Sequence, residues 1–136
     1  MSELIKNLSS NKFSFVLRLK SFTYAWSGIK NMLVNEHNSR VHLAFTIGVL
    51  LLSFIFHPST TELLLLLIVI AIVWIAELFN TCIEKIMDYI TLKKNLQIQR
   101  IKDMAAGAVL LASVTAFLVG AIVFIPKILK YVSFIL

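Results

Sequence analysis

The amino-acid sequence predicts an all-α integral membrane protein. It is expected to consist of an N-terminal amphipathic surface helix and three transmembrane helices, in a single membrane domain over residues 1–136. Hydrophobic residues make up 59% of the 136 residues and charged residues only 15%, whereas a soluble domain typically has about 45–50% apolar and about 25% charged residues. A chain of this length exposes too much surface to hide so many apolar side chains in one core. The composition therefore excludes an ordinary soluble domain.

Charge and cysteine content exclude further classes of protein. Cys82 is the single cysteine, so no internal disulfide can form. The formal net charge of +6 is typical of chains that bind nucleic acid or an anionic membrane surface. The mean hydropathy of +0.88 favours the membrane, and no nucleic-acid partner is expected. The four glycines form neither a P-loop nor a dinucleotide-binding fingerprint, so any nucleotide site is of another type.

The first expected element is an amphipathic helix over about residues 3–35. Its large apolar residues recur at alternating spacings of four and three, the pattern of a helix with one apolar face. They are Phe15, Leu19, Phe22, Trp26, Ile29 and Leu33. Basic and polar residues, among them Lys20 and Lys30, fall outside this stripe. Such a helix is expected to lie in the cytoplasmic interface of the membrane.

Three apolar segments follow and are expected to cross the membrane. The first is apolar from Val41 to Phe56 apart from His42, and His57-Pro58 then ends it. The last carries no charge from Met104 to Ile125, which is close to the ~20 residues that a span requires. The expected spans are about residues 39–58, about residues 62–90 with a cytoplasmic extension, and about residues 102–126.

The distribution of lysine and arginine predicts the orientation of these spans. Basic residues gather before the first span and between the second and third, whereas the connection over residues 57–62 has none. Cytoplasmic loops carry the excess of basic residues, so the N-terminus is expected on the cytoplasmic side and the C-terminus outside. Lys127 and Lys130 in the C-terminal tail oppose this assignment weakly.

The second span carries a polar stripe. Glu77, Asn80, Thr81, Glu84 and Asp88 share a helix face about 100° wide, because successive residues turn by about 100°. A helix-packing seam explains Asn80 and Thr81. It explains the three carboxylates poorly, since stacked negative charges repel one another unless a cation lies between them. Oxygen ligands suit Mg²⁺, and ionisable residues inside a membrane are functional candidates by default.

Two further polar groups are expected near the cytoplasmic end of this stripe. Lys102-Asp103 precedes the third span, where a membrane anchor and a helix N-cap are alternative explanations. Asn35-Glu36-His37 ends the surface helix, where a solvated loop is an equal alternative. Together these groups combine carboxylates that hold Mg²⁺ with the cations Lys93, Lys94, Arg100 and Lys102, which hold phosphate. Phosphoryl transfer needs this combination, and the buried Glu77 is suited to accept a proton from an alcohol.

Three segments of the sequence resemble the signature blocks of the prokaryotic diacylglycerol kinase family. They are SFTYAWSGIKNMLVNEHNSRVHL, AELFNTCIEKIMD and IKDMAAGAVLLA, and the resemblance covers about residues 15–125. It implies an integral-membrane lipid kinase that transfers the γ-phosphate of Mg·ATP to a lipid hydroxyl, with undecaprenol or diacylglycerol as acceptor. It also implies a homotrimer in the bacterial plasma membrane, with active sites that face the cytoplasm and are shared between neighbouring subunits.

The resemblance implies a role for individual residues. Glu77 is implied as the catalytic base with Asn80 beside it, and Glu36 and Glu84 as the metal ligands. The implied nucleotide-binding residues are Tyr24, Glu36, Glu84, Asp88, Lys93, Asn95, Lys102 and Asp103. The implied lipid-binding residues are Lys20, Trp26, Arg40, Glu77 and Ala106. Two positions depart from the family pattern: the loop before Lys102-Asp103 lacks a His-Pro or Tyr-His element, and Leu17 stands where some members have an arginine.

Two other functions remain as alternatives. A small ion-coupled transporter subunit would use Glu77 as its intramembrane ion site, and a membrane adaptor would have no enzymatic activity. Neither gives Lys102-Asp103 and Glu36 a common task. Among acceptor lipids, the pattern Asn38-x-Arg40-x-His42-Leu43 resembles the branch that contains undecaprenol kinases and slightly favours undecaprenol over diacylglycerol.

Overall fold

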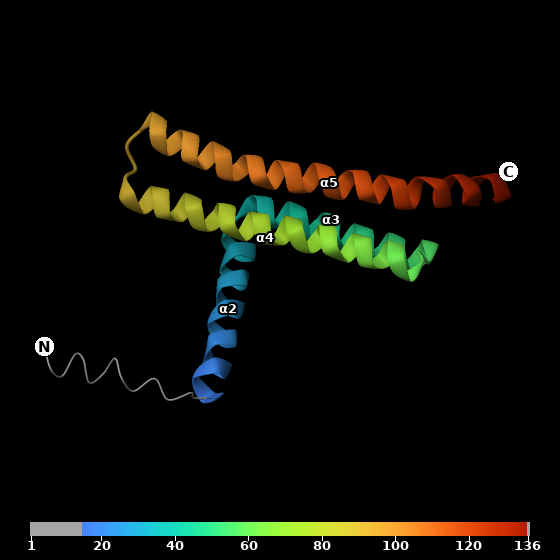
Figure 1. The fold of residues 1–136 in the computed structure, drawn as a ribbon, viewed down its shortest axis with the longest axis horizontal. Coiled ribbons are helices and arrows are strands. Elements are labelled where there is room, and N and C mark those ends of the chain that lie inside the picture. The colour runs from blue at the N-terminus through green and yellow to red at the C-terminus, as the bar shows by residue number, and fades with distance from the viewer. Residues whose placement is uncertain (1–14, 136) are drawn as a thin grey trace, which may run out of the picture. The chain divides into compact units, whose positions relative to one another are not determined.

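The computed structural model describes residues 15–135, which form four α-helices joined by short connections (Figure 1). Residues 3–14 of the expected surface helix lie outside the described part of the chain. The helices are α2 (Phe15–Asn35), α3 (His37–Phe56), α4 (Thr60–Ile90) and α5 (Leu96–Ile135). The chain divides into two compact units between Asn31 and Met32.

The helix of the first unit, α2, presents large apolar side chains that nothing covers within that unit. Leu19, Phe22 and Trp26 are 55%, 75% and 69% exposed. All described side chains from residue 18 to residue 31 are exposed. A location in the membrane interface stays a prediction for this helix.

The other three helices are long and apolar enough to cross a membrane. The shortest, α3, has 20 residues and is about 30 Å long at ~1.5 Å per residue, which equals the thickness of a typical hydrocarbon core. α4 has 31 residues and α5 has 40. The prediction of an all-helical membrane protein is therefore confirmed.

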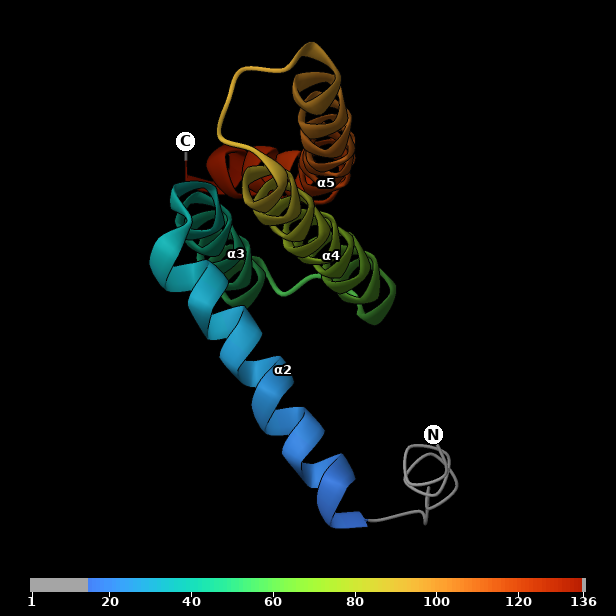
Figure 2. The same ribbon diagram turned by 90° about the vertical axis from the view of Figure 1, so that its left-hand side faces the viewer.

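In both views α3, α4 and α5 run alongside one another (Figures 1 and 2), with α4 packed along α5 and both in contact with α3. The apolar core lies near the end where α4 begins. It contains Leu66, Val123 and Phe124, and the ring of Phe56 lies against those of Phe124 and Tyr131 at centroid distances of 6.4 and 6.1 Å. The buried polar residues of α4, namely Glu77, Asn80 and Thr81, lie further along the helix.

The turn between α3 and α4 is held by local hydrogen bonds. His57 ends α3 in the left-handed region at φ 45°, and its N–H donates to the carbonyl of Ser53 at 3.1 Å. Ser59 then caps α4 reciprocally: its hydroxyl accepts from the N–H of Glu62 at 3.3 Å, and its own N–H donates to Oε2 of Glu62 at 2.6 Å. This capping box satisfies donors at the helix start that have no partner within the helix.

The last helix extends beyond the span expected at about residues 102–126. α5 begins at Leu96, and Pro126 lies inside it rather than ending it. Directly after this proline, Nζ of Lys127 lies 3.0 Å from Oε2 of Glu62. This ion pair attaches the C-terminal part of α5 to the beginning of α4.

Candidate functional site

One buried stripe runs along α4 and changes character from apolar to polar. Its members recur mostly three or four residues apart, so they share one face of the helix. They are Leu66, Val69, Val73, Glu77, Asn80 and Thr81. Glu77, Asn80 and Thr81 are only 2%, 4% and 6% exposed. Beyond them Glu84 is half-buried and Asp88 is exposed, so the predicted polar stripe opens towards the end of the helix.

The carboxylate of Glu77 is buried between α4 and α3. Oε1 accepts a hydrogen bond of 3.3 Å from the hydroxyl of Ser39, which is completely buried. Oε2 lies 3.9 Å from Nε2 of His42 and has no hydrogen-bond partner among the described residues. An unpaired buried carboxylate oxygen is costly, and such exceptions in native proteins mark functional groups or the place of a missing ligand.

α3 contributes a row of polar side chains to this contact. Ser39, His42 and Thr46 are spaced by three and four residues, so they share the face of α3 that meets α4. Thr46 donates to the carbonyl of His42 at 2.8 Å and accepts from Nε1 of Trp74 on α4 at 3.1 Å. Sequence reasoning missed Ser39 and Thr46. Their helical spacing from His42 in an otherwise apolar segment was the available signal.

A second unpaired oxygen lies one turn further along α4. Nδ2 of Asn80 donates to Oε1 of Glu84 at 3.3 Å, whereas Oδ1 of Asn80 is buried and has no partner in the described part of the chain. The NH₂ group of Asn80 therefore orients the Glu84 carboxylate, whereas its oxygen is free to accept a hydrogen bond. Oδ1 of Asn80 and Oε2 of Glu77 are two uncompensated oxygens on one helix face.

Glu36, the residue between α2 and α3, reaches α4 through an ion pair. Its Oε1 accepts from Nζ of Lys85 at 2.7 Å. Glu84 and Asp88 also act electrostatically on the Lys85 ammonium. A cation thus lies among three carboxylates, including both predicted metal ligands, Glu36 and Glu84.

The donor set fits Mg²⁺ only in part. Within residues 15–135 no group of three or more His, Cys, Asp or Glu side chains is arranged to hold a metal ion. Mg²⁺, however, is commonly held by one or two carboxylates together with water and substrate phosphates. Glu84, oriented by Asn80, fits that role, whereas Glu36 fits it only after Lys85 has moved away from its carboxylate.

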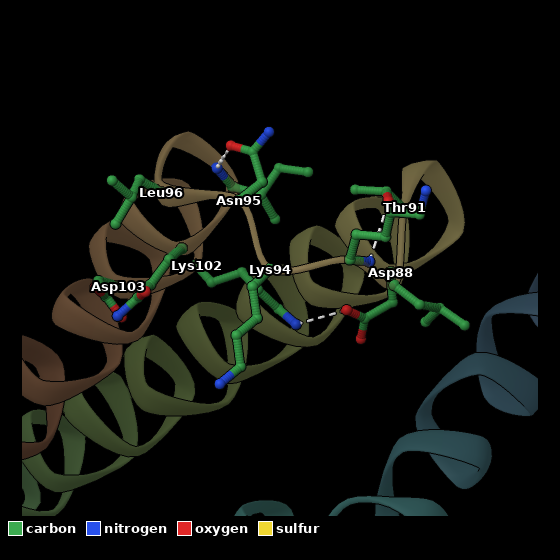
Figure 3. Close-up of a pocket in the computed structure, with 11 residues that line it drawn as sticks. Asp88, Thr91, Lys94, Asn95, Leu96, Lys102 and Asp103 are labelled. Carbon is green, nitrogen blue, oxygen red and sulfur yellow. Dashed lines mark hydrogen bonds and ion pairs between the residues drawn. The ribbon is translucent and has the colours of Figure 1, made fainter.

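An open pocket of about 480 Å³ lies between the end of α4 and the start of α5 (Figure 3). Its volume falls within the range of small-molecule sites. Five predicted nucleotide-binding residues line it, namely Asp88, Lys93, Asn95, Lys102 and Asp103. Nζ of Lys102 lies 2.6 Å from Oδ1 of Asp88 across the pocket. The structure therefore brings together residues that the sequence could only assign one by one.

The connection between α4 and α5 is ordered by its own side chains. Oγ1 of Thr91 accepts from the N–H of Lys93 at 3.1 Å. Oδ1 of Asn95 accepts from the N–H groups of Gln97 and Ile98 at 2.9 and 3.3 Å. Asn95 thereby caps the beginning of α5, and these local bonds shape the wall of the pocket.

The remaining predicted site residues are exposed side chains. Lys20, Tyr24 and Trp26 lie on α2 within the first unit, Arg40 lies on α3, and Ala106 lies on α5. Nothing in the described contacts adds to their predicted roles.

A family model described as "Prokaryotic diacylglycerol kinase" matches residues 23–124. The chain belongs to the prokaryotic diacylglycerol kinase family. The matched range contains every residue of the candidate site and all the predicted site residues except Lys20. The predicted resemblance is therefore confirmed, and so is the expectation of a lipid kinase, the class of enzyme of which the diacylglycerol kinase family consists.

Individual relatives carry the names of two kinases. A diacylglycerol kinase of Synechocystis sp. is 33% identical over 113 residues, which cover 82% of this chain and 65% of that protein. An undecaprenol kinase of Bacillus subtilis is 35% identical over 108 residues, or 79% of this chain and 88% of that protein. A diacylglycerol kinase of Escherichia coli K12 is 28% identical over 116 residues, or 85% and 94%. The names favour a kinase over a transporter subunit or an adaptor, and they leave the acceptor lipid open.

Proposed function

We propose that this protein transfers the γ-phosphate of ATP to the hydroxyl group of a membrane lipid, either undecaprenol or diacylglycerol. The reaction takes place at the cytoplasmic face of the bacterial plasma membrane. The observation that carries the proposal is Glu77, a carboxylate 2% exposed in a membrane helix, whose Oε2 has no hydrogen-bond partner among the described residues. A packing seam does not need such a group, whereas a general base does.

In the proposed reaction the oxygen of the lipid hydroxyl attacks the γ-phosphorus, and Glu77 takes the proton of that hydroxyl. The lipid O–H bond breaks, the new O–P bond forms, and the bond from the γ-phosphorus to the bridging oxygen of ADP breaks. Ser39 holds Oε1 of Glu77, which leaves Oε2 to face the hydroxyl. Oδ1 of Asn80, also buried and unpaired in the described region, is suited to accept a hydrogen bond from the incoming hydroxyl.

The pocket between α4 and α5 is suited to hold the nucleotide. Helical rise separates Glu77 from Asp88, which lines the pocket, by roughly 16 Å along α4. A molecule that engages both ends must be extended, as the triphosphate of ATP is. Lys93 and Lys102 line the pocket and supply positive charge for the phosphates, as phosphoryl transfer requires. Tyr24, Asn95 and Asp103 are proposed as further nucleotide contacts.

Mg²⁺ is proposed as the metal cofactor, with Glu36 and Glu84 as its protein ligands. When bound, the ion neutralises phosphate charge. The hydrogen bond from Asn80 orients the Glu84 carboxylate beforehand, so this ligand needs little rearrangement. Lys20, Trp26, Arg40 and Ala106 are proposed to contact the lipid acceptor.

We further propose a homotrimer in which neighbouring subunits complete each site. In support, the pocket that one chain offers between α4 and α5 is open, so a single chain does not enclose a nucleotide. Mixing two inactive variants tests this directly: Glu77→Gln subunits combined with Glu36→Gln subunits should regain part of the activity. Mixtures that stay as inactive as the separate variants would contradict shared sites.

The proposed activity is tested with purified protein, radiolabelled ATP and mixed micelles that contain undecaprenol, diacylglycerol or ceramide. A phosphorylated lipid should form with undecaprenol or diacylglycerol, should require Mg²⁺, and should be absent with Glu77→Gln. Glu62→Gln, at the far end of the same helix, is the matched control. Absence of a phosphorylated product with every lipid would contradict the kinase proposal. The ion-coupled transporter subunit would then be the favoured alternative.

A further inference from the structure

We infer that His42 is a positioning residue for the phosphotransfer step, and that it receives from Glu77 the proton taken from the lipid hydroxyl. This inference rests on the proposed function. It assigns a task to a histidine that neither the nucleotide pocket nor the metal ligands use.

The geometry directs His42 at one particular oxygen. Nε2 of His42 lies 3.9 Å from Oε2 of Glu77, the oxygen that has no hydrogen-bond partner in residues 15–135. The other oxygen is occupied by Ser39 at 3.3 Å. The two side chains from α3 therefore lie at different oxygens of the Glu77 carboxylate. Ser39 binds Oε1 and orients the carboxylate, whereas His42 lies near Oε2, the oxygen that is free to react.

His42 is less enclosed than Glu77. The side chain of His42 is 18% exposed, whereas that of Glu77 is 2% exposed. A proton left on Glu77 is thus more enclosed within the helix pair than a proton on the neighbouring imidazole. An imidazole can also accept a proton on one ring nitrogen and release one from the other, which suits it to pass protons on.

The backbone of α3 is fixed next to this imidazole. Thr46 donates to the carbonyl of His42 and accepts from Trp74 on α4. The helix turn that carries His42 is thereby tied to α4 one turn away from Glu77. A polar contact of this kind between two membrane helices contributes little to stability, so its main effect is to fix the position of α3 along α4.

Every bond and proton in the proposed step is accounted for. The lipid O–H bond breaks and its oxygen binds the γ-phosphorus of ATP, while ADP leaves with the electron pair of the broken P–O bond. The proton goes to Oε2 of Glu77, then to Nε2 of a neutral His42, and from there to water. Glu77 is again an unprotonated base for the next acceptor molecule.

The test compares full-length His42→Gln and His42→Ala with the wild type, in the micellar assay with saturating Mg²⁺. His57→Asn is the matched control, because it removes an exposed imidazole directly after the same helix and asparagine tolerates the left-handed backbone. We expect His42→Gln to lower kcat by about 100-fold, the lower end of what a positioned proton-transfer group contributes. The KM values for ATP and lipid should stay within about twofold, since neither substrate is bound by the imidazole.

Added imidazole should restore part of the lost kcat in His42→Ala. It should not restore kcat in Glu77→Gln. An unchanged kcat in His42→Gln, a change confined to KM, or a lost kcat that imidazole does not restore would each overturn the inference. If His42→Ala does not assemble, His42→Gln, of similar volume, carries the kinetic test alone. A wild-type protein that phosphorylates no lipid would refute the kinase proposal itself. An active wild-type protein whose kcat does not depend on His42 would refute only the inference about His42.

Discussion

Nζ of Lys85 lies 2.7 Å from Oε1 of Glu36, so a basic side chain of α4 binds a carboxylate that the family resemblance assigns to Mg²⁺. Glu84 and Asp88 act on the same ammonium. Lys85 is therefore paired with a residue that we propose as a ligand of Mg²⁺. If Glu36 binds the metal as proposed, Mg²⁺ and Lys85 compete for the same carboxylate, and this competition has measurable consequences.

The first prediction concerns Lys85→Met. Removing the ammonium frees Glu36, so the Mg²⁺ concentration for half-maximal activity should fall by roughly two- to fivefold, the effect expected from releasing an exposed ion pair. A Mg²⁺ titration of initial rates measures this, with the exposed Lys130→Met as control. An unchanged or higher Mg²⁺ requirement would remove Glu36 from the metal site.

The second prediction concerns Glu77→Gln. The amide cannot accept the hydroxyl proton, so kcat should fall by about 10²–10⁴-fold. ATP binding, measured calorimetrically, should be nearly unchanged because the pocket lies roughly 16 Å along α4. The midpoint of thermal unfolding should not fall, since a neutral amide costs less free energy to bury than a carboxylate. Lost ATP binding with retained turnover would be incompatible with the assignment.

The third prediction concerns Lys102→Met. Lys102 lines the pocket and pairs with Asp88 at 2.6 Å, and a phosphate group is expected to compete for this ammonium. Its loss should raise KM for ATP by about tenfold or more, the usual effect of deleting a hydrogen bond to a charged group, while KM for the lipid stays constant. Initial rates at varied ATP test this against Lys130→Met, and equal KM values in both variants would argue against the pocket.

The fourth prediction separates the scaffold from the chemistry. Ser59→Ala removes the hydroxyl that caps α4, which should destabilise the protein by about 1 kcal/mol and lower its thermal midpoint without altering kcat. Ser133→Ala is the control, because its hydroxyl donates to the carbonyl of Lys130 late in α5 and caps no helix start. A lower kcat in Ser59→Ala at a temperature where it is fully folded would show that the two ends of the bundle are coupled.

Much of the architecture could be predicted because it depends on local properties of the chain. The apolar runs of α3, α4 and α5 identify membrane helices by length and composition. The spacing of Glu77, Asn80 and Thr81 identified a face that avoids lipid, and all three are buried. The extent of α5 was less predictable: Pro126 signals an end in an isolated segment, but α5 continues through it, and Lys127, which follows, is paired with Glu62.

By itself, then, the sequence determined the membrane class, the polar face of α4 and the kinase family, because hydropathy, helical period and motif spacing are written along the chain. Tertiary structure alone decided which groups meet: Ser39 and His42 at Glu77, Lys85 at Glu36, and Lys102 at Asp88. The partners in each pair come from different elements of the fold. The packing of one helix against another chooses them, and no period within a single segment encodes that choice.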